Sequence, residues 1–398
     1  MKVLFFVHRF WPSVGGVEKY VRHLATAVRA AGHDVTVVAG DTQGGLREIE
    51  THEGVSIHRF PASRSTLRCR MWMWRHRRLF QDADVVQVSN THMLEYLWRM
   101  LGPWLDRRKI FLTRHGFGGT YPIPEVQRHR AKRSLGLAAG FIHDGEFIAH
   151  WLGVPADETP RQGIFPKAID LPDIPEPPPT SAVYVGRLEP DTAIQIYVDG
   201  IRELAAKHRR PITFHVIGEG SLLGGLRAQA ADEHLPIEFH GSIPDAQNRI
   251  SDYCFAFVDG RMAIQEAMAR KRVVIAAYGN PLRMDYVCGE SFSPFVVPVA
   301  DAGQLAVEVM QLIDHTAVRR ALTDRAFAYA KTLSWEATAQ AFVALWRNRL
   351  AAPMPLLALW DRISIFCGYS LNRNARTPHF SSGNAGQPML PFGKPFST

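Results

Sequence analysis

Short apolar runs alternate along the chain with stripes of apolar residues at helical spacing. Residues 3–7 (VLFFV) form a continuous apolar run, which is typical of a strand buried on both faces of a sheet. Residues 18–31 then place apolar side chains at helical spacing, and Gly32 ends this pattern. Strand-like runs follow at 34–40, 55–60, 83–90 and 109–116. This alternation predicts a parallel sheet with helices on both faces.

The proline-rich segment PDIPEPPP (172–179) interrupts the alternation and predicts a stiff linker. A second alternating set follows, with strands predicted at 181–188, 212–220, 237–243, 253–260 and 272–279 and helices near 193–207, 222–233 and 263–270. We therefore predict two doubly wound α/β halves with a cleft between the carboxyl ends of their sheets. The two predicted domains are residues 1–171 and 181–335, joined by a linker at 172–180. A helix is predicted at 336–352, which could cross back to the first domain, and it is followed by a partly disordered tail at 353–398, which is rich in Pro, Gly and Ser.

Composition agrees with two soluble domains. A chain of 398 residues is too long for one ordinary core, and 46% hydrophobic with 21% charged residues is typical of a globular protein. The cysteines lie far apart, without metal-ligand spacing, which suits a reducing cytosol; they are Cys69, Cys254, Cys288 and Cys367. His8 and Arg9 end the first apolar run too early for a signal peptide, and no apolar stretch reaches the ~20 residues that span a bilayer. We predict a cytoplasmic protein whose membrane contact, if any, is peripheral at the inner face.

The positive charge is concentrated in the first part of the chain. Residues 1–150 hold 22 Lys and Arg against 13 Asp and Glu, whereas the remainder holds 24 against 25. An anionic partner should therefore meet the first half.

A series of motifs along the chain carries the functional prediction. They are FWPSVGGVEKYVRHLATAVRAAGHDVTVV, DVVQVSN, RHG, GIFPKAIDL, VGRLEPD, VIGEGSLL, FHGSIPD and QEAMARKRVVIA. In this order and spacing they resemble the family 4 retaining glycosyltransferases of the GT-B fold, over roughly residues 1–350. The resemblance implies two Rossmann-like domains, an N-terminal acceptor domain and a C-terminal donor domain. It also implies transfer of a sugar from a nucleotide donor with retention of configuration and without a bound metal or other cofactor.

In the first half, the resemblance implies roles for a glycine pair and a histidine. Gly15 and Gly16 precede a helix whose free N–H groups and positive dipole end suit an anion, and in the family this loop lies over the donor phosphates and the acceptor. The alternative is a tight turn in which glycine supplies a positive φ. His115, in TRHG, corresponds to a histidine that touches the donor sugar. The alternative is a packed histidine bonded to backbone.

In the second half, Arg187 and Glu266 are the main candidates. The Arg187 guanidinium, just past a strand, suits a diphosphate and would offset charge on the leaving group, unless it is an ordinary surface arginine. Glu266 corresponds to a glutamate that accepts hydrogen bonds from the donor ribose, the alternative being a surface glutamate that pairs with a helix dipole. Gly218 lies in a strand-end turn near the donor, and Ile243 would flank the nucleotide base through its backbone.

Two positions depart from the family pattern. Thr192 replaces a lysine and Val258 replaces a glutamate, and we expect Asp259 or Arg261 to take over contacts to sugar or phosphate. The catalytic candidates are His115, Arg187 and Asp259. The substrate-binding candidates are Gly15, Gly16, Arg187, Gly218, Ile243, Arg261 and Glu266, and no metal ligands are predicted.

Residues 67–80 (LRCRMWMWRHRRLF) interleave arginine and histidine with tryptophan, methionine and phenylalanine. Such a segment suits anionic lipid headgroups or a lipid-diphosphate-linked acceptor. Nucleic acid is a rival, because arginine and tryptophan also contact phosphates and bases. A third possibility is a solvated basic helix whose tryptophans pack inward. Basic aromatic segments in the acceptor half of such enzymes favour the membrane.

The main hypothesis is a retaining glycosyltransferase that uses a UDP- or GDP-sugar and acts on a glycan or lipid-linked acceptor. A second hypothesis is a non-catalytic GT-B scaffold or regulatory partner, because Thr192 and Val258 remove donor-site charges. A third is a GT-B epimerase of nucleotide sugars, which would need a carboxylate and histidine set in the cleft.

Overall fold

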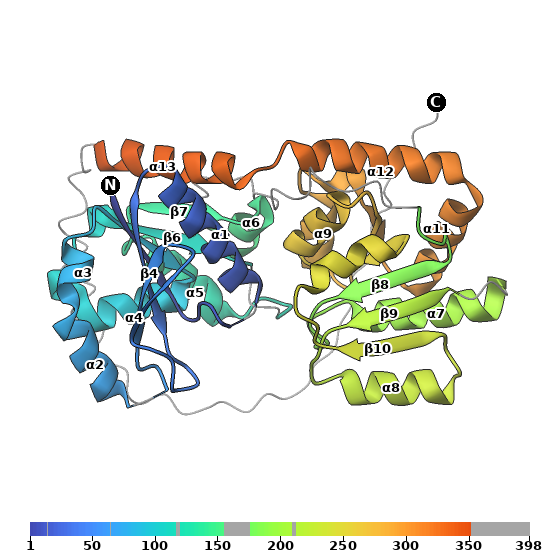
Figure 1. The fold of residues 1–398 in the computed structure, drawn as a ribbon, viewed down its shortest axis with the longest axis horizontal. Coiled ribbons are helices and arrows are strands. Elements are labelled where there is room, and N and C mark those ends of the chain that lie inside the picture. Colours follow the sequence, from blue (N-terminus) through green and yellow to red (C-terminus); the bar gives the residue numbers. More distant parts are fainter. Residues whose placement is uncertain (14, 64, 117–119, 155–175, 209–211, 352–398) are drawn as a thin grey trace, which may run out of the picture. The chain divides into compact units, whose positions relative to one another are not determined.

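Two sheets covered by helices organise the part of the chain that the structure describes (Figure 1). The structure is a computed structural model and describes all residues except 14, 64, 117–119, 155–175, 209–211 and 352–398. Residues 1–352 form one unit that contains both sheets. The motif at 163–171, residues 172–175 of the predicted linker and the predicted tail at 353–398 lie outside the described residues.

The first sheet, among the described residues, has seven strands in the order β3-β4-β2-β1-β5-β6-β7. All pairs are parallel except β3 with β4. The strands are β1 (Lys2–Val7), β2 (Asp34–Gly40), β3 (Ile49–His52), β4 (Val55–Phe60), β5 (Val85–Ser89), β6 (Ile110–Arg114) and β7 (Gly140–His143). The strand order reverses between β1 and β5. In open α/β sheets, ligands bind at the carboxyl ends of the strands beside such a switch point.

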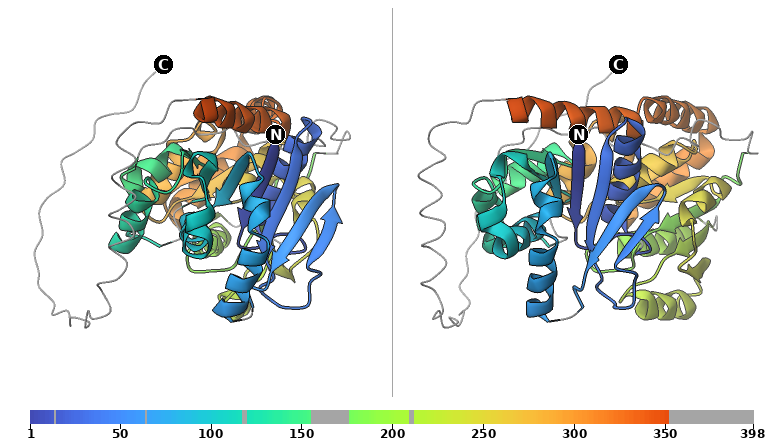
Figure 2. Two further views of the ribbon diagram at one scale, coloured as in Figure 1. Left: turned by 90° about the vertical axis from the view of Figure 1, so that its left-hand side faces the viewer. Right: turned by 60° about the vertical axis from the view of Figure 1, so that its left-hand side comes forward.

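Helices cover both faces of this sheet (Figures 1 and 2). Alternate residues of β1 point to opposite faces, so that Phe5 packs with α1 (Gly16–Ala30) and Phe6 with α4 (Thr91–Leu101). The helix α13 (Trp335–Ala351) shares the face of α1, whereas α2 (Thr66–Arg75) and α3 (Arg77–Gln81) share the face of α4. Both faces are therefore buried, which explains the continuous apolar runs in the sequence.

The second sheet is parallel throughout and has the order β10-β9-β8-β11-β12-β13 in the described residues. Its strands are β8 (Ser181–Val185), β9 (Thr213–Ile217), β10 (Ile237–Gly241), β11 (Phe255–Phe257), β12 (Val273–Ala277) and β13 (Val297–Val299). The helices α7 (Ile194–His208) and α11 (Ala302–Asp314) cover one face, and α9 (Arg261–Met268) and α12 (Thr316–Lys331) cover the other. Its switch point lies between β8 and β11, so the segments after these two strands are the expected ligand side.

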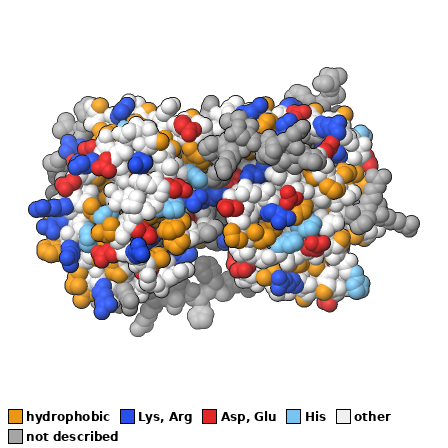
Figure 3. All heavy atoms as spheres, in the orientation of Figure 1, with side chains coloured by type: hydrophobic (Ala, Val, Ile, Leu, Met, Phe, Trp, Pro, Cys, Tyr) orange, Lys and Arg blue, Asp and Glu red, His pale blue; other side chains and the backbone are white. Residues whose placement is uncertain are grey.

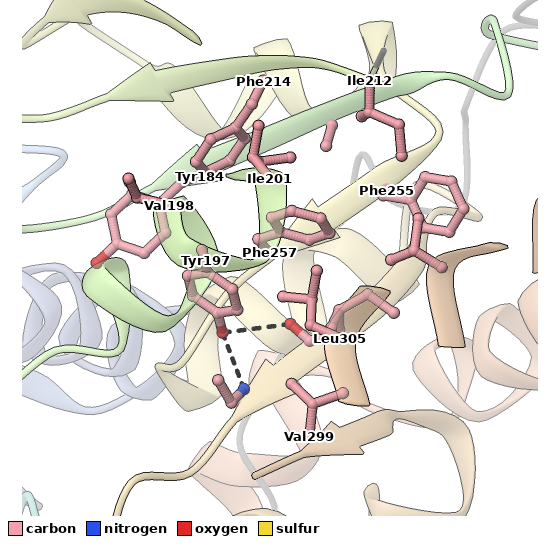
Figure 4. Close-up of a cluster of buried hydrophobic side chains, with 14 of the residues drawn as sticks. Tyr184, Tyr197, Val198, Ile201, Ile212, Phe214, Phe255, Phe257, Val299 and Leu305 are labelled. Carbon is pink, nitrogen blue, oxygen red and sulfur yellow. Dashed lines mark hydrogen bonds between the residues drawn. The ribbon is translucent and has the colours of Figure 1, made fainter. Parts of the chain in front are cut away.

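Aromatic rings fill the core between the second sheet and α7 (Figure 4). The Tyr197 ring of α7 stacks on Phe257 of β11, with ring centroids 5.2 Å apart. Its buried hydroxyl accepts from the Ala277 backbone N–H at 3.0 Å and donates to the Val258 carbonyl oxygen at 3.0 Å. Because burying an unpaired hydroxyl is costly, these bonds fix how α7 sits on the ends of β11 and β12.

The remaining helices are α5 (Glu125–Ser134), α6 (Glu146–Leu152), α8 (Leu223–Asp232) and α10 (Pro281–Cys288). A small apolar cluster joins α5 and α6 of the first half to Leu282 of α10. The Trp151 indole N–H of α6 also donates to the Asp285 carboxylate of α10 at 2.8 Å. These contacts are one of the places where the two halves touch.

The strands predicted from the apolar runs are confirmed, with ends that differ by a few residues. The sequence patterns missed β3, β7 and β13. The β3 strand (IETH) is polar and half-exposed at the sheet edge, while β7 and β13 have only four and three residues. In the described part of the chain, no helix is long and apolar enough to cross a membrane.

Candidate active site

The glycine pair after β1 begins helix α1 without a conformational need for glycine. Gly15 has an extended backbone, with φ −176° and ψ 165°, and neither Gly15 nor Gly16 has a positive φ. A Cβ on Gly16 would meet nothing within 4 Å, and no side chain caps the helix start. The tight-turn alternative is therefore excluded for these two residues. Without side chains of their own, the glycines would let a ligand approach the backbone of the helix N-terminus closely.

Glu18 is the group that already lies at this helix end. Its carboxylate occupies the position that a Cβ on Gly15 would enter. A carboxylate in the first turn is favourable because it meets the positive end of the helix dipole. A bound phosphate would compete with Glu18 for the same helix end.

His115 lies just after β6 and is held from two neighbouring strand ends. Its Nδ1 lies 2.8 Å from the Asp144 Oδ2, which follows β7, and its backbone N–H donates to the Asn90 Oδ1, which follows β5, at 3.1 Å. The His115 side chain is 4% exposed. The sequence analysis named His115 and missed Asn90 and Asp144. The available signal was a polar residue directly after each apolar run, in VSN, TRHG and HDG.

The other nitrogen of His115 is buried and has no hydrogen-bond partner among the described residues. Within the described part of the chain, neither His115 Nε2 nor the Tyr20 hydroxyl has a hydrogen-bond partner. The two rings meet edge to face, with centroids 4.9 Å apart. Burial, reinforced by the Asp144 carboxylate, raises the pKa of Tyr20 well above its usual value, so its hydroxyl stays protonated. An aspartate-oriented histidine with a buried, unpaired second nitrogen is ready to bind a substrate group.

In the second half, Arg187 lies in the loop after β8. Its side chain is 66% exposed and pairs with Asp191 at 2.8 Å. The loop is fixed by the Tyr184 hydroxyl, which donates to the Arg187 carbonyl oxygen at 2.8 Å. Thr192, which stands where the family has lysine, turns its hydroxyl back to the Glu189 carbonyl oxygen at 2.7 Å. In this loop Arg187 therefore supplies the exposed cation.

The loops after β8, β9 and β10 pack directly on one another. Gly218 has φ +151°, and a Cβ there would overlap the Gly186 carbonyl oxygen. Its backbone N–H donates to the Gly241 carbonyl oxygen at 2.8 Å. Ile243 follows, half-buried against the core. Gly218 is thus required by backbone packing, which sets the positions of Arg187 and Ile243 relative to each other.

Asp259 and Arg261 both bind protein groups rather than standing free. The Asp259 Oδ2 accepts from the Ala193 backbone N–H, just before α7, at 2.7 Å. Arg261 is buried and pairs with Glu290 at 2.5 Å. Val258, where the family has glutamate, is fully buried. Asp259 therefore anchors the start of α7, and Arg261 is part of an internal ion pair.

Two contacts join these second-half residues to the first half. A Cβ on Gly145, which follows Asp144, would overlap the side chains of Glu290 and Arg261. Glu266 of α9 accepts from the Lys19 ammonium of α1 at 2.6 Å, and its side chain is 8% exposed. The structure thus brings Glu266 to the first turn of α1, and Arg261 to the segment of Asp144.

Comparison with known proteins identifies the family. Residues 14–152 match the family model described as Glycosyltransferase Family 4, and residues 179–315 match the one described as Glycosyl transferases group 1. A phosphatidyl-myo-inositol mannosyltransferase of Mycolicibacterium smegmatis is 23% identical over 358 residues, covering 81% of this chain and 87% of that protein. The chain belongs to the GT-B glycosyltransferases of the family 4 type. The resemblance read from the sequence motifs is confirmed.

Solved structures show the same fold as this glycosyltransferase. Sucrose-phosphate synthase from Thermosynechococcus elongatus has a TM-score of 0.65 at 18% identity, covering 89% of this chain and 100% of that one. HepE of Anabaena, solved with UDP, has a TM-score of 0.66 at 16% identity, covering 87% and 100%. A further HepE structure contains UDP-glucose. The predicted GT-B fold is confirmed.

The basic aromatic segment of the glycosyltransferase, residues 67–80, forms α2 and α3. Trp72 is buried, and its indole N–H donates to Glu48 at 2.8 Å, whereas Trp74 is 55% exposed with the Arg77 guanidinium over its ring. Leu67 and Met71 are exposed beside Trp74. The inward-packing alternative is therefore right for Trp72 and wrong for Trp74. Figure 3 shows Lys and Arg side chains along the edge of the molecule that carries α2 and α3.

Proposed function

We propose that this glycosyltransferase transfers a sugar from a nucleotide-sugar donor to a glycan or lipid-linked acceptor, with retention of anomeric configuration and without a metal. The contact between Lys19 and Glu266, 2.6 Å long, carries the proposal. It puts the carboxylate expected to hold the donor ribose beside the first turn of α1. That turn follows the glycine pair expected to meet the donor phosphates. One nucleotide diphosphate can therefore engage both groups.

The candidate residues after the strands of the two sheets suit a reaction driven by positioning and charge stabilisation. A donor loses its nucleoside diphosphate, so negative charge builds on the leaving phosphate, and the exposed Arg187 guanidinium is a suitable partner for it. In the proposed front-face substitution, the acceptor oxygen bonds to the anomeric carbon on the side that the phosphate leaves. The departing phosphate takes the proton of the acceptor hydroxyl. In this proposal the donor sugar forms a hydrogen bond with the His115 Nε2, which is buried and has no hydrogen-bond partner among the described residues.

The donor test is a calorimetric panel of UDP-, GDP- and ADP-sugars in the presence of EDTA, with free sugar as the control. HepE was solved with UDP and with UDP-glucose, which supports a uridine donor as the first candidate. We expect one nucleotide class to bind, and NMR of the product to show the anomeric configuration of the donor. Binding that requires a divalent metal, or a product of inverted configuration, would contradict the proposal.

Two other outcomes of this panel have distinct meanings. Absence of binding and of turnover for every donor would favour the non-catalytic scaffold. Conversion of the nucleotide sugar into its epimer without an acceptor would favour an epimerase, for which the pair of His115 and Asp144 is the kind of set required. The family match argues for transfer over both.

We further propose that the α2–α3 segment brings the enzyme to an anionic membrane that holds its acceptor. The exposed face of α2 combines Trp74, Leu67 and Met71 with Arg70 and Arg75. Aromatic and aliphatic groups settle at the headgroup boundary, while each Lys or Arg contributes about 1 kcal/mol at an anionic surface. The name of the mannosyltransferase relative, which acts on a phosphatidyl-inositol, supports a lipid-linked acceptor.

Co-sedimentation with vesicles of anionic and of neutral lipid tests this surface. We expect the wild type to pellet with anionic vesicles at low salt. A variant with serine in place of Arg75, Arg77 and Arg78 should no longer pellet with them. A matched control changes Arg130, Lys132 and Arg133 of α5 to Ser, which removes the same charge elsewhere. Equal pelleting of all three proteins would contradict the proposal. Tighter binding to an oligonucleotide through the same arginines would favour the nucleic-acid alternative.

A further inference from the structure

A cluster of metal-binding side chains lies on the edge of the second sheet, and the sugar transfer does not use it. His215 belongs to β9, and Glu238 and His240 belong to the neighbouring edge strand β10. Glu238 pairs with His215 in the register of the two strands. Figure 3 shows histidine side chains beside acidic ones on the face of the molecule near these strands. Their apolar neighbours Phe214, Val216 and Phe239 pack into the core on the other face.

An irregularity in β10 brings the third residue into place. The register between β9 and β10 passes from Phe239 directly to Gly241, so His240 is an extra, unpaired residue of a β-bulge. Bulges re-aim side chains and are common beside functional positions. Here the His240 ring stacks on the His215 ring, with an interplanar angle of 13°, and their nearest nitrogens are 2.9 Å apart.

The spacing of the ligand atoms matches a tetrahedral zinc site. The Glu238 Oε2 lies 3.3 Å from the His215 Nδ1 and 3.8 Å from the His240 Nε2. In a tetrahedral site with metal–ligand bonds of 2.0–2.2 Å, ligand atoms lie about 3.3–3.6 Å from one another. The three observed separations bracket this range, so one ion could bind all three atoms with shifts of a few tenths of an ångström.

An aromatic ring, a paired arginine and the contact between the two imidazoles surround the ligand atoms. Tyr253 packs on the His215 ring at 4.6 Å, and Arg249, which is paired with Asp252, is the nearby cation. Without a metal, two imidazoles that meet nitrogen to nitrogen share at most one proton between them.

We propose that His215, Glu238 and His240 bind one Zn²⁺ ion, with water in the fourth position. Two imidazoles and one carboxylate suit Zn²⁺, Co²⁺ and Ni²⁺ and discriminate against Mg²⁺, which requires oxygen ligands. The ion ties β9 to β10 just before the loops that contain Gly218 and Ile243. Zinc therefore stiffens the part of the donor half where those loops pack together, and it takes no part in the chemical step.

The experiment is calorimetric titration of the full chain, free of any affinity tag, with Zn²⁺. We expect one ion per chain for the wild type and no heat with Mg²⁺. His240→Ala and Glu238→Gln should each weaken binding by roughly 100-fold, because every ligand contributes to the affinity of a small site. The matched control is His234→Asn, since His234 is exposed, outside the cluster and at φ +49°, a conformation that asparagine adopts readily.

Two further measurements keep the test decisive. Binding of Co²⁺ should give the intense visible absorption of a tetrahedral complex in wild type and His234→Asn, and not in His240→Ala. Zn²⁺ should raise the thermal midpoint of the same two proteins. Circular dichroism checks that each variant is folded. Zinc binding of equal affinity in wild type and His240→Ala, or none in wild type, would overturn the proposal, and neither result bears on the transfer reaction.

Discussion

Changing Asp144 to Asn tests whether His115 works as an oriented pair. The Asp144 Oδ2 lies 2.8 Å from the His115 Nδ1, and the two side chains are 16% and 4% exposed. A hydrogen bond to a charged group in such a site contributes about 1.5–3 kcal/mol. At about 1.4 kcal/mol for each factor of ten, its loss should lower kcat/KM by roughly 10- to 150-fold. The asparagine amide can also donate to Nδ1, which would leave Nε2 protonated and unable to accept a hydrogen bond.

The assay is the initial rate of transfer from the nucleotide sugar that binds, with the free energy of unfolding measured on the same preparations. Asp106→Asn is the matched control, because Asp106 makes a 2.7 Å ion pair with Arg108 at the surface. His115→Gln and the double variant complete a cycle, in which the two effects should be far from additive. Activity of Asp144→Asn within twofold of wild type, or strict additivity in the cycle, would refute the pairing.

Three further changes probe the donor half and the junction with α13. Arg187→Ala should lower kcat/KM by roughly 10- to 100-fold. Its free energy of unfolding should stay within about 1 kcal/mol of the wild-type value, because the exposed ion pair of Arg187 contributes little to stability. Turnover within a few-fold of wild type would exclude a role of Arg187 at the diphosphate. Glu266→Gln should weaken nucleotide binding in calorimetry while the protein stays folded. An unchanged nucleotide affinity would mean that Glu266 only pairs with Lys19. Burial lowers the pKa of His23, stacked on Trp335, to about 4. An unfolded histidine has a pKa near 6.5, so at pH values below about 6.5 the unfolded chain binds more protons at His23 than the folded protein does. The free energy of unfolding of the wild type should therefore fall by about 1–2 kcal/mol between pH 7 and pH 5. Denaturant titrations should show that His23→Gln removes most of this pH dependence.

The fold could be read from the sequence where strands are buried on both faces. The run that became β1 is continuous and apolar, and those of β2 and β8 are mostly apolar, because helices cover them from two sides. Ile49, at the start of the edge strand β3, is 57% exposed and belongs to no apolar run. Its pairing with β4 depends on the neighbouring strand, which local patterns do not record.

The sequence indicated where candidate site residues lie along the chain, but not which protein groups they contact. His115 and Arg187 became candidates from the family resemblance together with their position after a strand. Asp144 is 29 residues from His115 in the chain, and only the pairing of β6 with β7 makes them neighbours. The same limit applies to Asp259, whose bond to the Ala193 backbone spans 66 residues. Residue type indicates which groups can bind a ligand, whereas tertiary packing decides which of them already bind the protein.

The last described helix, α13, completes the core of the first sheet. Trp346 is fully buried against Phe5, with ring centroids 6.3 Å apart, and its indole N–H donates to the Gln87 side chain at 2.9 Å. During synthesis, β1 leaves the ribosome more than three hundred residues before this helix. The apolar surface that α13 covers on the first sheet therefore stays exposed until nearly all of the second half has been synthesised. A fragment cut at the linker would lack that cover permanently. The two halves have separate sheets, but the core of the first half can be completed only after the second half has been synthesised.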